Sequence, residues 1–128
     1  MARRILVVED SDDARRLLVD ALSSHGYEVL EAGSGEEAID RVLSERPDLV
    51  VLDMSLPAKS GWEVAAEVSQ GPAGDIPIIA LSGYTSETDR QKALEAGCVI
   101  YLEKPCRPRD LISQIERILE SLGSMASG

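Results

Sequence analysis

Most of the short apolar runs in this chain end in a side chain that can take part in chemistry. These residues are Glu9 and Asp10, Asp53, Ser82 and Lys104. Three carboxylates that meet at one site repel one another and raise one another's pKa values. A hard divalent cation such as Mg²⁺, which prefers oxygen ligands, removes that penalty. With a lysine cation and a hydroxyl opposite, the group predicts a phosphoryl-transfer site in which a carboxylate is the nucleophile.

Asp53 directly follows the apolar run Leu49–Leu52. A short, continuous run rich in β-branched residues is typical of a strand buried on both faces. Pro57 and Gly61 then predict a loop before the next helix. Taken alone, Asp53 is equally well explained as a helix cap or a turn residue. At the carboxyl end of a central parallel strand, it would lie where open α/β sheets bind their ligands.

The elements that position these residues alternate between strand and helix along the whole chain. Strands are predicted over Arg3–Val8, Tyr27–Glu31, Leu49–Asp53, Ile76–Leu81 and Cys98–Leu102. Helices are predicted from Ser11 or Asp12 to His25, and over Glu36–Glu45, Trp62–Ser69, Ser86–Ala96 and Arg109–Leu122. This alternation predicts an α/β fold, a doubly wound five-stranded parallel sheet with five helices on both faces. In the strand order 2-1-3-4-5 the first and third strands are neighbours, so the three acids would meet.

Apolar spacing predicts which helix faces turn inward. The expected inner face of the first helix is Leu17, Leu18, Ala21 and Leu22, and that of the second is Ala38, Ile39, Val42 and Leu43. The last helix has the clearest period, through Leu111, Ile112, Ile115, Ile118, Leu119 and Leu122. The single histidine, His25, lies at a predicted helix end and is interpreted as a surface residue.

Composition bounds the class of protein. The 128 residues fit one domain over residues 1–122, followed by a small-residue tail over 123–128 that we expect to be flexible. A net charge of −10 argues against direct binding of nucleic acid or an anionic membrane. No apolar run is long enough to span a bilayer, and the chain enters a strand too early for a signal peptide. Cys98 and Cys106 lack metal-site spacing, and a cytoplasmic protein with reduced thiols is expected.

Four motifs together resemble the receiver domain of bacterial two-component response regulators, of the CheY-like, single-domain type with a flavodoxin-like fold. The motifs are ILVVED, DMSLPAKSG around Asp53, ALSG and YLEKP. By position, the resemblance implies that Asp53 is the phosphoacceptor, with Ser82 and Lys104 bonding the phosphoryl group. It further implies a Mg²⁺ site, with Mn²⁺ as a substitute, formed by Glu9, Asp10, Asp53 and the backbone carbonyl of Ser55. Tyr101 resembles the aromatic switch residue, and the Lys104–Pro105 peptide bond is expected to be cis.

The resemblance also implies partners and a way of signalling. A sensor histidine kinase or a histidine phosphotransfer protein would donate the phosphoryl group. The surface formed by the fourth helix, fifth strand and fifth helix would then change shape and bind a protein target or a second copy. Such a chain is not an enzyme in the ordinary sense, although it takes part in its own phosphorylation and dephosphorylation.

Three other interpretations stay open from the sequence. A phosphatase of the haloacid-dehalogenase type also uses an aspartate nucleophile, but it places a second acid where Ser55 stands here. A flavin or nucleotide carrier needs a phosphate-binding loop after the first strand, where the acids of 9–13 would repel phosphate. The chain could also be a receiver excised from a hybrid kinase or a multidomain regulator.

Overall fold

The computed structural model describes residues 2–84 and 86–127, with side chains through Leu122. The strands are β1 (Arg4–Val8), β2 (Glu28–Ala32), β3 (Leu49–Asp53), β4 (Ile78–Ser82) and β5 (Ile100–Glu103). The helices are α1 (Asp12–Ser24), α2 (Gly35–Glu45), α3 (Gly61–Gln70), α4 (Glu87–Glu95) and α5 (Pro108–Ser127). All strand pairs are parallel, in the order β2-β1-β3-β4-β5, which confirms the predicted fold class and strand order.

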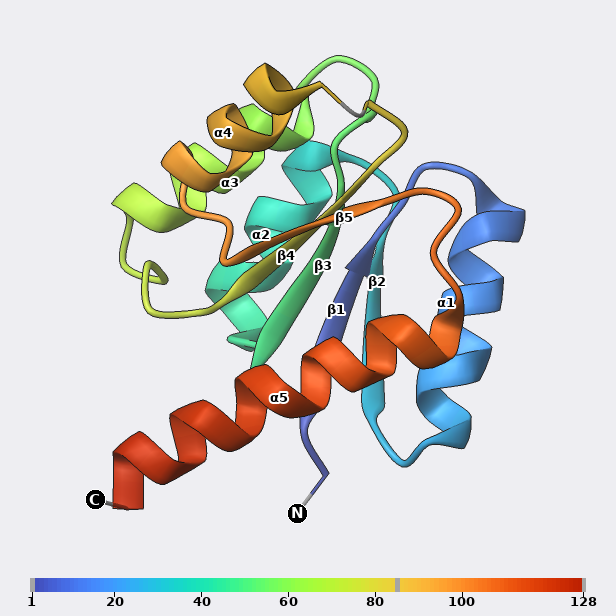
Figure 1. The fold of residues 1–128 in the computed structure, drawn as a ribbon, viewed down its shortest axis with the longest axis vertical. Helices are drawn as coiled ribbons and strands as arrows, with labels where there is room; N and C mark the ends of the chain where they lie inside the picture. Colours follow the sequence, from blue (N-terminus) through green and yellow to red (C-terminus); the bar gives the residue numbers. More distant parts are fainter. Residues whose placement is uncertain (1, 85, 128) are drawn as a thin grey trace.

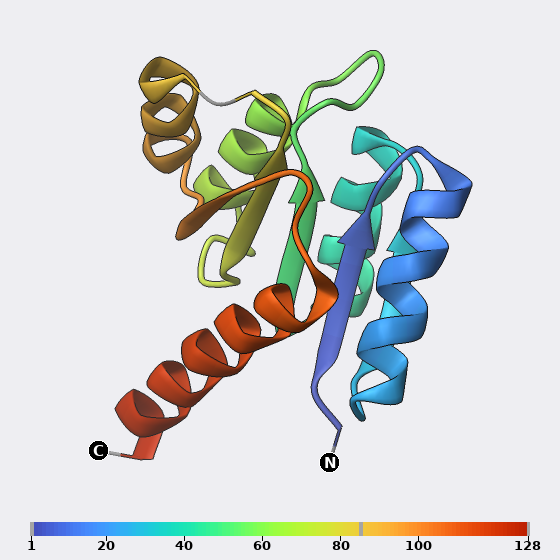
Figure 2. The same ribbon diagram turned by 45° about the vertical axis from the view of Figure 1, so that its right-hand side comes forward.

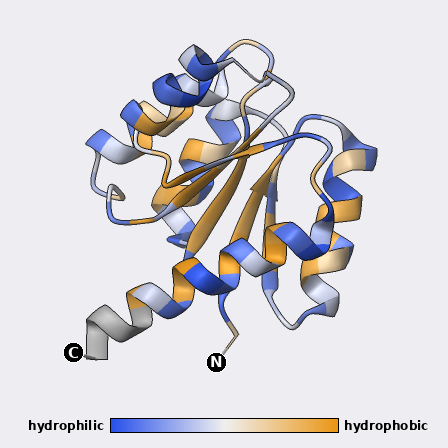
Figure 3. Cartoon of the chain, in the orientation of Figure 1, coloured by the Kyte–Doolittle hydropathy of each residue, from blue (hydrophilic) through white to orange (hydrophobic). Residues whose placement is uncertain are grey.

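The sheet separates two layers of helices (Figures 1 and 2). Helices α1 and α5 cover one face, and α2, α3 and α4 cover the other. Alternate residues of β1 supply the two cores: Ile5 packs with the residues of α1 and α5, and Leu6 packs with those of α2 and α3. Because both faces are covered, the central strands are apolar on both sides, as Figure 3 shows.

Serine side chains begin four of the helices. Ser11, Ser34, Ser60 and Ser86 each accept a hydrogen bond from the backbone N–H three residues further on. Each serine thereby satisfies one N–H group that the first helical turn leaves without a partner. These caps fix where each helix starts after the loop at the carboxyl end of the preceding strand. Among the described residues, we find no helix both long and apolar enough to cross a membrane.

Three predicted helix faces need correction. Leu17 is 69% exposed, Leu43 is 52% exposed and Leu122 is 41% exposed, although the apolar spacing predicts that all three face inward. Leu22 is the buried residue of α1, whereas Ala38 and Val42 are buried in α2. The reason is that each helix presents a narrow stripe to the sheet, and the leucine beside that stripe points past it.

Helix α5 is longer than predicted, because it continues from Leu122 to Ser127. Residues 123–127 are therefore helical in their backbone where the sequence suggested a tail. Their side chains and Gly128 lie outside the described residues, so the flexibility of the tail stays a prediction. The other element boundaries agree with the predicted ones to within two residues, which is usual for helix and strand ends.

Candidate functional site

Three carboxylates meet at the carboxyl end of the sheet. In the register of β1 and β3, Val8 pairs with Leu52, so Glu9 and Asp53 follow side by side. One carboxylate oxygen from each of Glu9, Asp10 and Asp53 lies within 4.8 Å of the other two. Glu9 is 4% exposed and Asp53 is 3% exposed, whereas Asp10 is open to solvent. The predicted strand order therefore brings these acids together.

Lys104 supplies the positive charge of the site. Its Nζ lies 3.1 Å from Glu9 Oε1 and 3.1 Å from Asp53 Oδ1. The backbone N–H of Lys104 donates to the Ser82 carbonyl at 2.8 Å, which ties the end of β5 to the end of β4. The Lys104–Pro105 peptide bond is cis. One lysine thus faces two buried carboxylates from across the sheet edge.

Backbone N–H groups orient both buried acids. The Ser11 N–H donates to Glu9 Oε2 at 3.2 Å, and the Ser55 N–H donates to Asp53 Oδ1 at 3.1 Å. Burial raises the pKa of the Glu9 carboxyl, although hydrogen bonds from Ser11 and Lys104 oppose that shift. Burial alone would lower the pKa of Lys104, but its hydrogen bonds to the two carboxylates outweigh burial and raise the pKa overall. Lys104 therefore stays charged beside the acids.

The donor set fits a hard divalent cation. Carboxylate oxygens are the ligands that Mg²⁺ prefers, and the exposed Asp10 leaves an open side on which waters can complete the coordination. Three acids with a single lysine also carry an excess of negative charge, which a cation would offset. The Ser55 carbonyl belongs to the loop directly after Asp53, on the same edge of the sheet.

Ser82 lies on β4, the strand next to β3, and Tyr101 lies on β5, one strand further from the acids. Ser82 is fully buried at the end of β4, and its Oγ accepts a hydrogen bond from the Tyr84 N–H at 2.9 Å. Tyr101 is 4% exposed, and its hydroxyl donates to the Tyr84 carbonyl. The Arg90 guanidinium of α4 lies 5.5 Å from the centre of the Tyr101 ring. The structure thus shows Tyr101 already packed inward, with Tyr84 contacted by both residues.

Two residues near the site were not assigned to it from the sequence. Gly61 begins α3 so close to β3 that an added Cβ would lie 2.7 Å from the Asp53 carbonyl oxygen. Arg15 of α1 donates from Nη1 to the Glu9 carbonyl at 2.8 Å. The sequence marks Gly61 as a chain breaker after Asp53. No sequence pattern indicates the Arg15 contact, because it depends on how far the arginine side chain reaches.

Comparison with known proteins decides the family. The chain matches the family described as "Response regulator receiver domain" over residues 5–116, which is most of its length. This chain belongs to the response regulator receiver family. The resemblance drawn from the four motifs is therefore confirmed, and the family is one of signalling proteins rather than ordinary enzymes.

Individual relatives agree with this assignment. The receiver is 34% identical over 127 residues to the phosphate regulon transcriptional regulatory protein PhoB of Escherichia coli, covering 98% of this chain and 56% of that protein. It is 37% identical to the "Probable transcriptional regulator ycf27" of Porphyridium aerugineum, covering 97% and 51% of the two chains. The crystal structure of a CheY-like receiver domain protein from Methanospirillum hungatei superposes with a TM-score of 0.92 at 29% identity, covering 98% and 99%. The receiver thus spans about half the length of the curated relatives it matches.

Proposed function

We propose that this receiver accepts a phosphoryl group on Asp53 and thereby relays a two-component signal. The observation that carries the proposal is the buried Asp53 carboxylate, whose Oδ1 is held by Lys104 Nζ and the Ser55 N–H. Both the hydrogen bond from the Ser55 N–H and the ion pair with Lys104 are made by Asp53 Oδ1. We therefore assign Oδ2 as the attacking atom.

The proposed reaction is an in-line transfer from a phosphohistidine. Asp53 Oδ2 forms a bond to phosphorus as the phosphorus–nitrogen bond breaks, and the imidazole leaves with the bonding electron pair and takes up a proton. The product on Asp53 is an acyl phosphate. Lys104 balances the charge of the transferred group, and the Ser82 hydroxyl is available to donate to one of its oxygens. Water would later attack the phosphorus and release inorganic phosphate.

We expect Glu9, Asp10 and Asp53, with the Ser55 carbonyl, to hold Mg²⁺ or Mn²⁺. Bound there, the cation would offset the negative charge of the carboxylate and of the transferring group. The acid cluster supports this expectation because its oxygens lie within 4.8 Å of one another. Excess EDTA should therefore prevent phosphorylation.

The proposed signal leaves through Ser82 and Tyr101. A phosphoryl group adds charge and acceptor oxygens that draw the Ser82 hydroxyl toward Asp53. In this proposal the Tyr101 ring has two positions, the buried one seen here and one turned outward to solvent. Phosphorylation shifts the equilibrium toward the buried position by a few kcal/mol. The surface of α4, β5 and α5 follows this shift and binds a protein target or a second copy.

The phosphoryl donor is a sensor histidine kinase or a histidine phosphotransfer protein. Because such a donor is charged from ATP, we place the reaction in the cytoplasm. The relatives PhoB and ycf27 are described as transcriptional regulators and are about twice as long as this chain. This receiver could act alone or as the receiver part of a longer regulator.

The test is phosphate uptake from acetyl phosphate, followed by intact-mass measurement. The wild-type chain should gain one phosphoryl group in the presence of Mg²⁺, whereas Asp53→Asn should gain none. Asp13→Asn is the matched control, because Asp13 is an exposed residue in the first turn of α1. Equal uptake by Asp53→Asn would refute the assignment. Sustained release of phosphate from small phosphomonoesters would instead support the phosphatase alternative, which the family assignment does not favour.

A further inference from the structure

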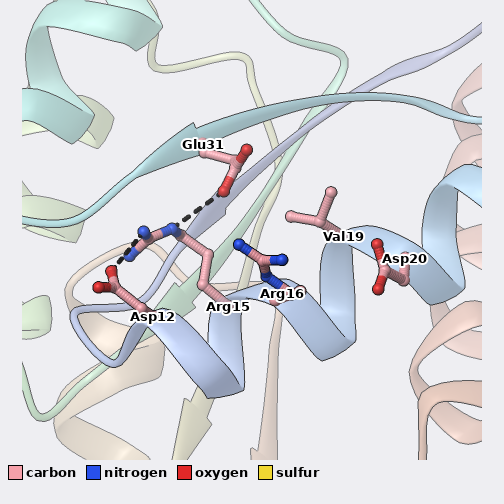
Figure 4. A pocket seen from close by; sticks show the side chains of 6 residues that line it. All are labelled: Asp12, Arg15, Arg16, Val19, Asp20 and Glu31. Atoms are coloured by element: carbon pink, nitrogen blue, oxygen red, sulfur yellow. Dashed lines mark hydrogen bonds and ion pairs between the residues drawn. The ribbon is translucent and has the colours of Figure 1, made fainter.

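Arg15 connects three parts of the chain around the acid cluster. Its Nη1 donates to the Glu9 carbonyl at 2.8 Å, and its Nε donates to Glu31 Oε1 of β2 at 3.0 Å. Its Nη2 donates to Asp12 Oδ1 at 2.7 Å. The Arg15 side chain is only 19% exposed. Figure 4 shows the guanidinium held between Asp12 and Glu31, with the Arg16 side chain beside it.

The Glu9 carbonyl is a specific target for this contact. It belongs to the peptide group that joins Glu9 to Asp10. The carboxylates of these two residues are two of the three in the acid cluster. The Glu9 N–H still bonds to the Ala32 carbonyl of β2 at 3.1 Å, so sheet pairing reaches Glu9 from one side. Pairing between the strands ends there, and Arg15 supplies the hydrogen-bond donor for the Glu9 carbonyl.

The two flanking carboxylates keep the arginine in place. Hydrogen bonds to Asp12 and Glu31 raise the pKa of Arg15, so the side chain is charged under all conditions in which the protein folds. The planar guanidinium presents its donors in a fixed geometry, which an ammonium group cannot reproduce. Within the described part of the chain, the Asp10 side chain makes no hydrogen bond, so its position depends on the backbone that Arg15 holds.

We propose that Arg15 is a positioning residue for the cation and phosphoryl site. It fixes the Glu9–Asp10 peptide, so that the two carboxylates converge with Asp53 before the cation arrives. The proposal rests on the proposed function, because it assigns Arg15 to the same site. Residues that orient metal ligands from outside the coordination sphere typically change metal affinity by about 10-fold or more when they are replaced.

The test measures Mn²⁺ binding through the paramagnetic resonance signal of free Mn²⁺, in wild-type protein and in Arg15→Gln. We expect Arg15→Gln to bind Mn²⁺ about 10-fold more weakly. Arg16→Gln is the matched control: it removes the same charge from the neighbouring position, where no hydrogen bond or ion pair links the side chain to any described residue. Its affinity should stay within about twofold of wild type, because long-range charge effects at the surface are small.

Phosphate uptake separates positioning from a purely structural role. At limiting Mg²⁺ the Arg15→Gln variant should react more slowly than wild type, and saturating Mg²⁺ should restore most of the rate. A structural role would lower stability in urea without moving the Mn²⁺ affinity of the folded protein. Unchanged affinity in Arg15→Gln, or equal losses in Arg15→Gln and Arg16→Gln, would overturn the proposal.

A second variant keeps the proposal testable if Arg15→Gln does not fold. Glu31→Ala removes a half-exposed carboxylate that orients the guanidinium, and it should weaken Mn²⁺ binding several-fold. A folded Glu31→Ala protein with wild-type affinity would also count against the proposal. Wild-type protein that neither binds Mn²⁺ nor takes up phosphate would refute the proposed function itself, which is a separate outcome.

Discussion

Replacing Gly61 with alanine tests how closely α3 is packed against the end of β3. A Cβ at position 61 would lie 2.5 Å from the Met54 Cα and 2.7 Å from the Asp53 carbonyl oxygen. Both are backbone atoms, which cannot rotate away as the end of a side chain can. The Gly61 N–H also donates to the Met54 carbonyl at 3.1 Å, so helix and strand are joined at this point.

Two effects of the Gly61→Ala substitution oppose each other. Alanine favours a helix over glycine by up to about 1 kcal/mol, and on that ground alone the variant would be more stable. Inserting a methyl group into a packed site costs about 1–3 kcal/mol, and here the displaced atoms belong to the backbone. We therefore expect the free energy of unfolding to fall by about 1–2 kcal/mol. At roughly 4 °C per kcal/mol, the melting temperature should fall by roughly 4–8 °C.

Urea unfolding followed by circular dichroism measures this change, with Gly83→Ala as the matched control. Gly83 follows the site residue Ser82, but a Cβ there would meet no atom of the described residues within 4 Å, apart from its two chain neighbours. Its replacement should change stability by less than about 0.5 kcal/mol. Because the Asp53 carbonyl must move, Gly61→Ala should also take up phosphate more slowly. A Gly61→Ala protein as stable as wild type would show that helix propensity outweighs the contact, which would refute the reasoning.

Three further perturbations test other parts of the structure. Tyr101→Phe removes the buried hydroxyl that donates to the Tyr84 carbonyl, and it should lower the free energy of unfolding by about 1 kcal/mol. An unchanged urea unfolding curve would show that this hydrogen bond does not stabilise the fold. Leu22→Ala should lower the free energy of unfolding by about 2–5 kcal/mol, because Leu22 is buried, whereas Leu17→Ala should lower it by less than about 0.5 kcal/mol. Similar losses in the two variants would mean that α1 buries a different face. Burial raises the pKa of Cys98 to about 12, so its thiol stays protonated at pH 8 and should react with a thiol reagent only after unfolding. Cys106 is more exposed and should react first, which Cys106→Ser checks by leaving Cys98 as the single thiol.

The sequence was sufficient to predict where the acids meet. Glu9 and Asp53 each end an apolar run, and in parallel strands such ends share one edge of the sheet. Once the strand order is 2-1-3-4-5, their proximity follows without any side-chain detail. Lys104 and Ser82 are brought to the same edge by the same rule.

Contacts that depend on how helices rotate and dock could not be predicted in this way. Hydrophobic periodicity shows that one face of α1 is apolar but not where the narrow buried stripe on that face ends, so it predicts Leu17 to face inward although Leu17 is exposed. The Arg15 contact with the Glu9 carbonyl joins a helix to a loop through a long side chain, and spacing along the chain does not report it. The inward position of Tyr101 likewise depends on Tyr84, whose carbonyl is brought within reach only by the fold.

The most direct test of the account is chemical identification of the phosphorylated residue. Borohydride reduces an acyl phosphate to an alcohol, so a phosphorylated aspartate becomes homoserine and keeps that mark through proteolysis. Protein phosphorylated by acetyl phosphate in Mg²⁺, then reduced and sequenced by tandem mass spectrometry, should carry homoserine at position 53 and at no other aspartate. Homoserine at position 10, or no homoserine in protein that has gained a phosphoryl group, would contradict the assignment of Asp53 as the phosphoacceptor.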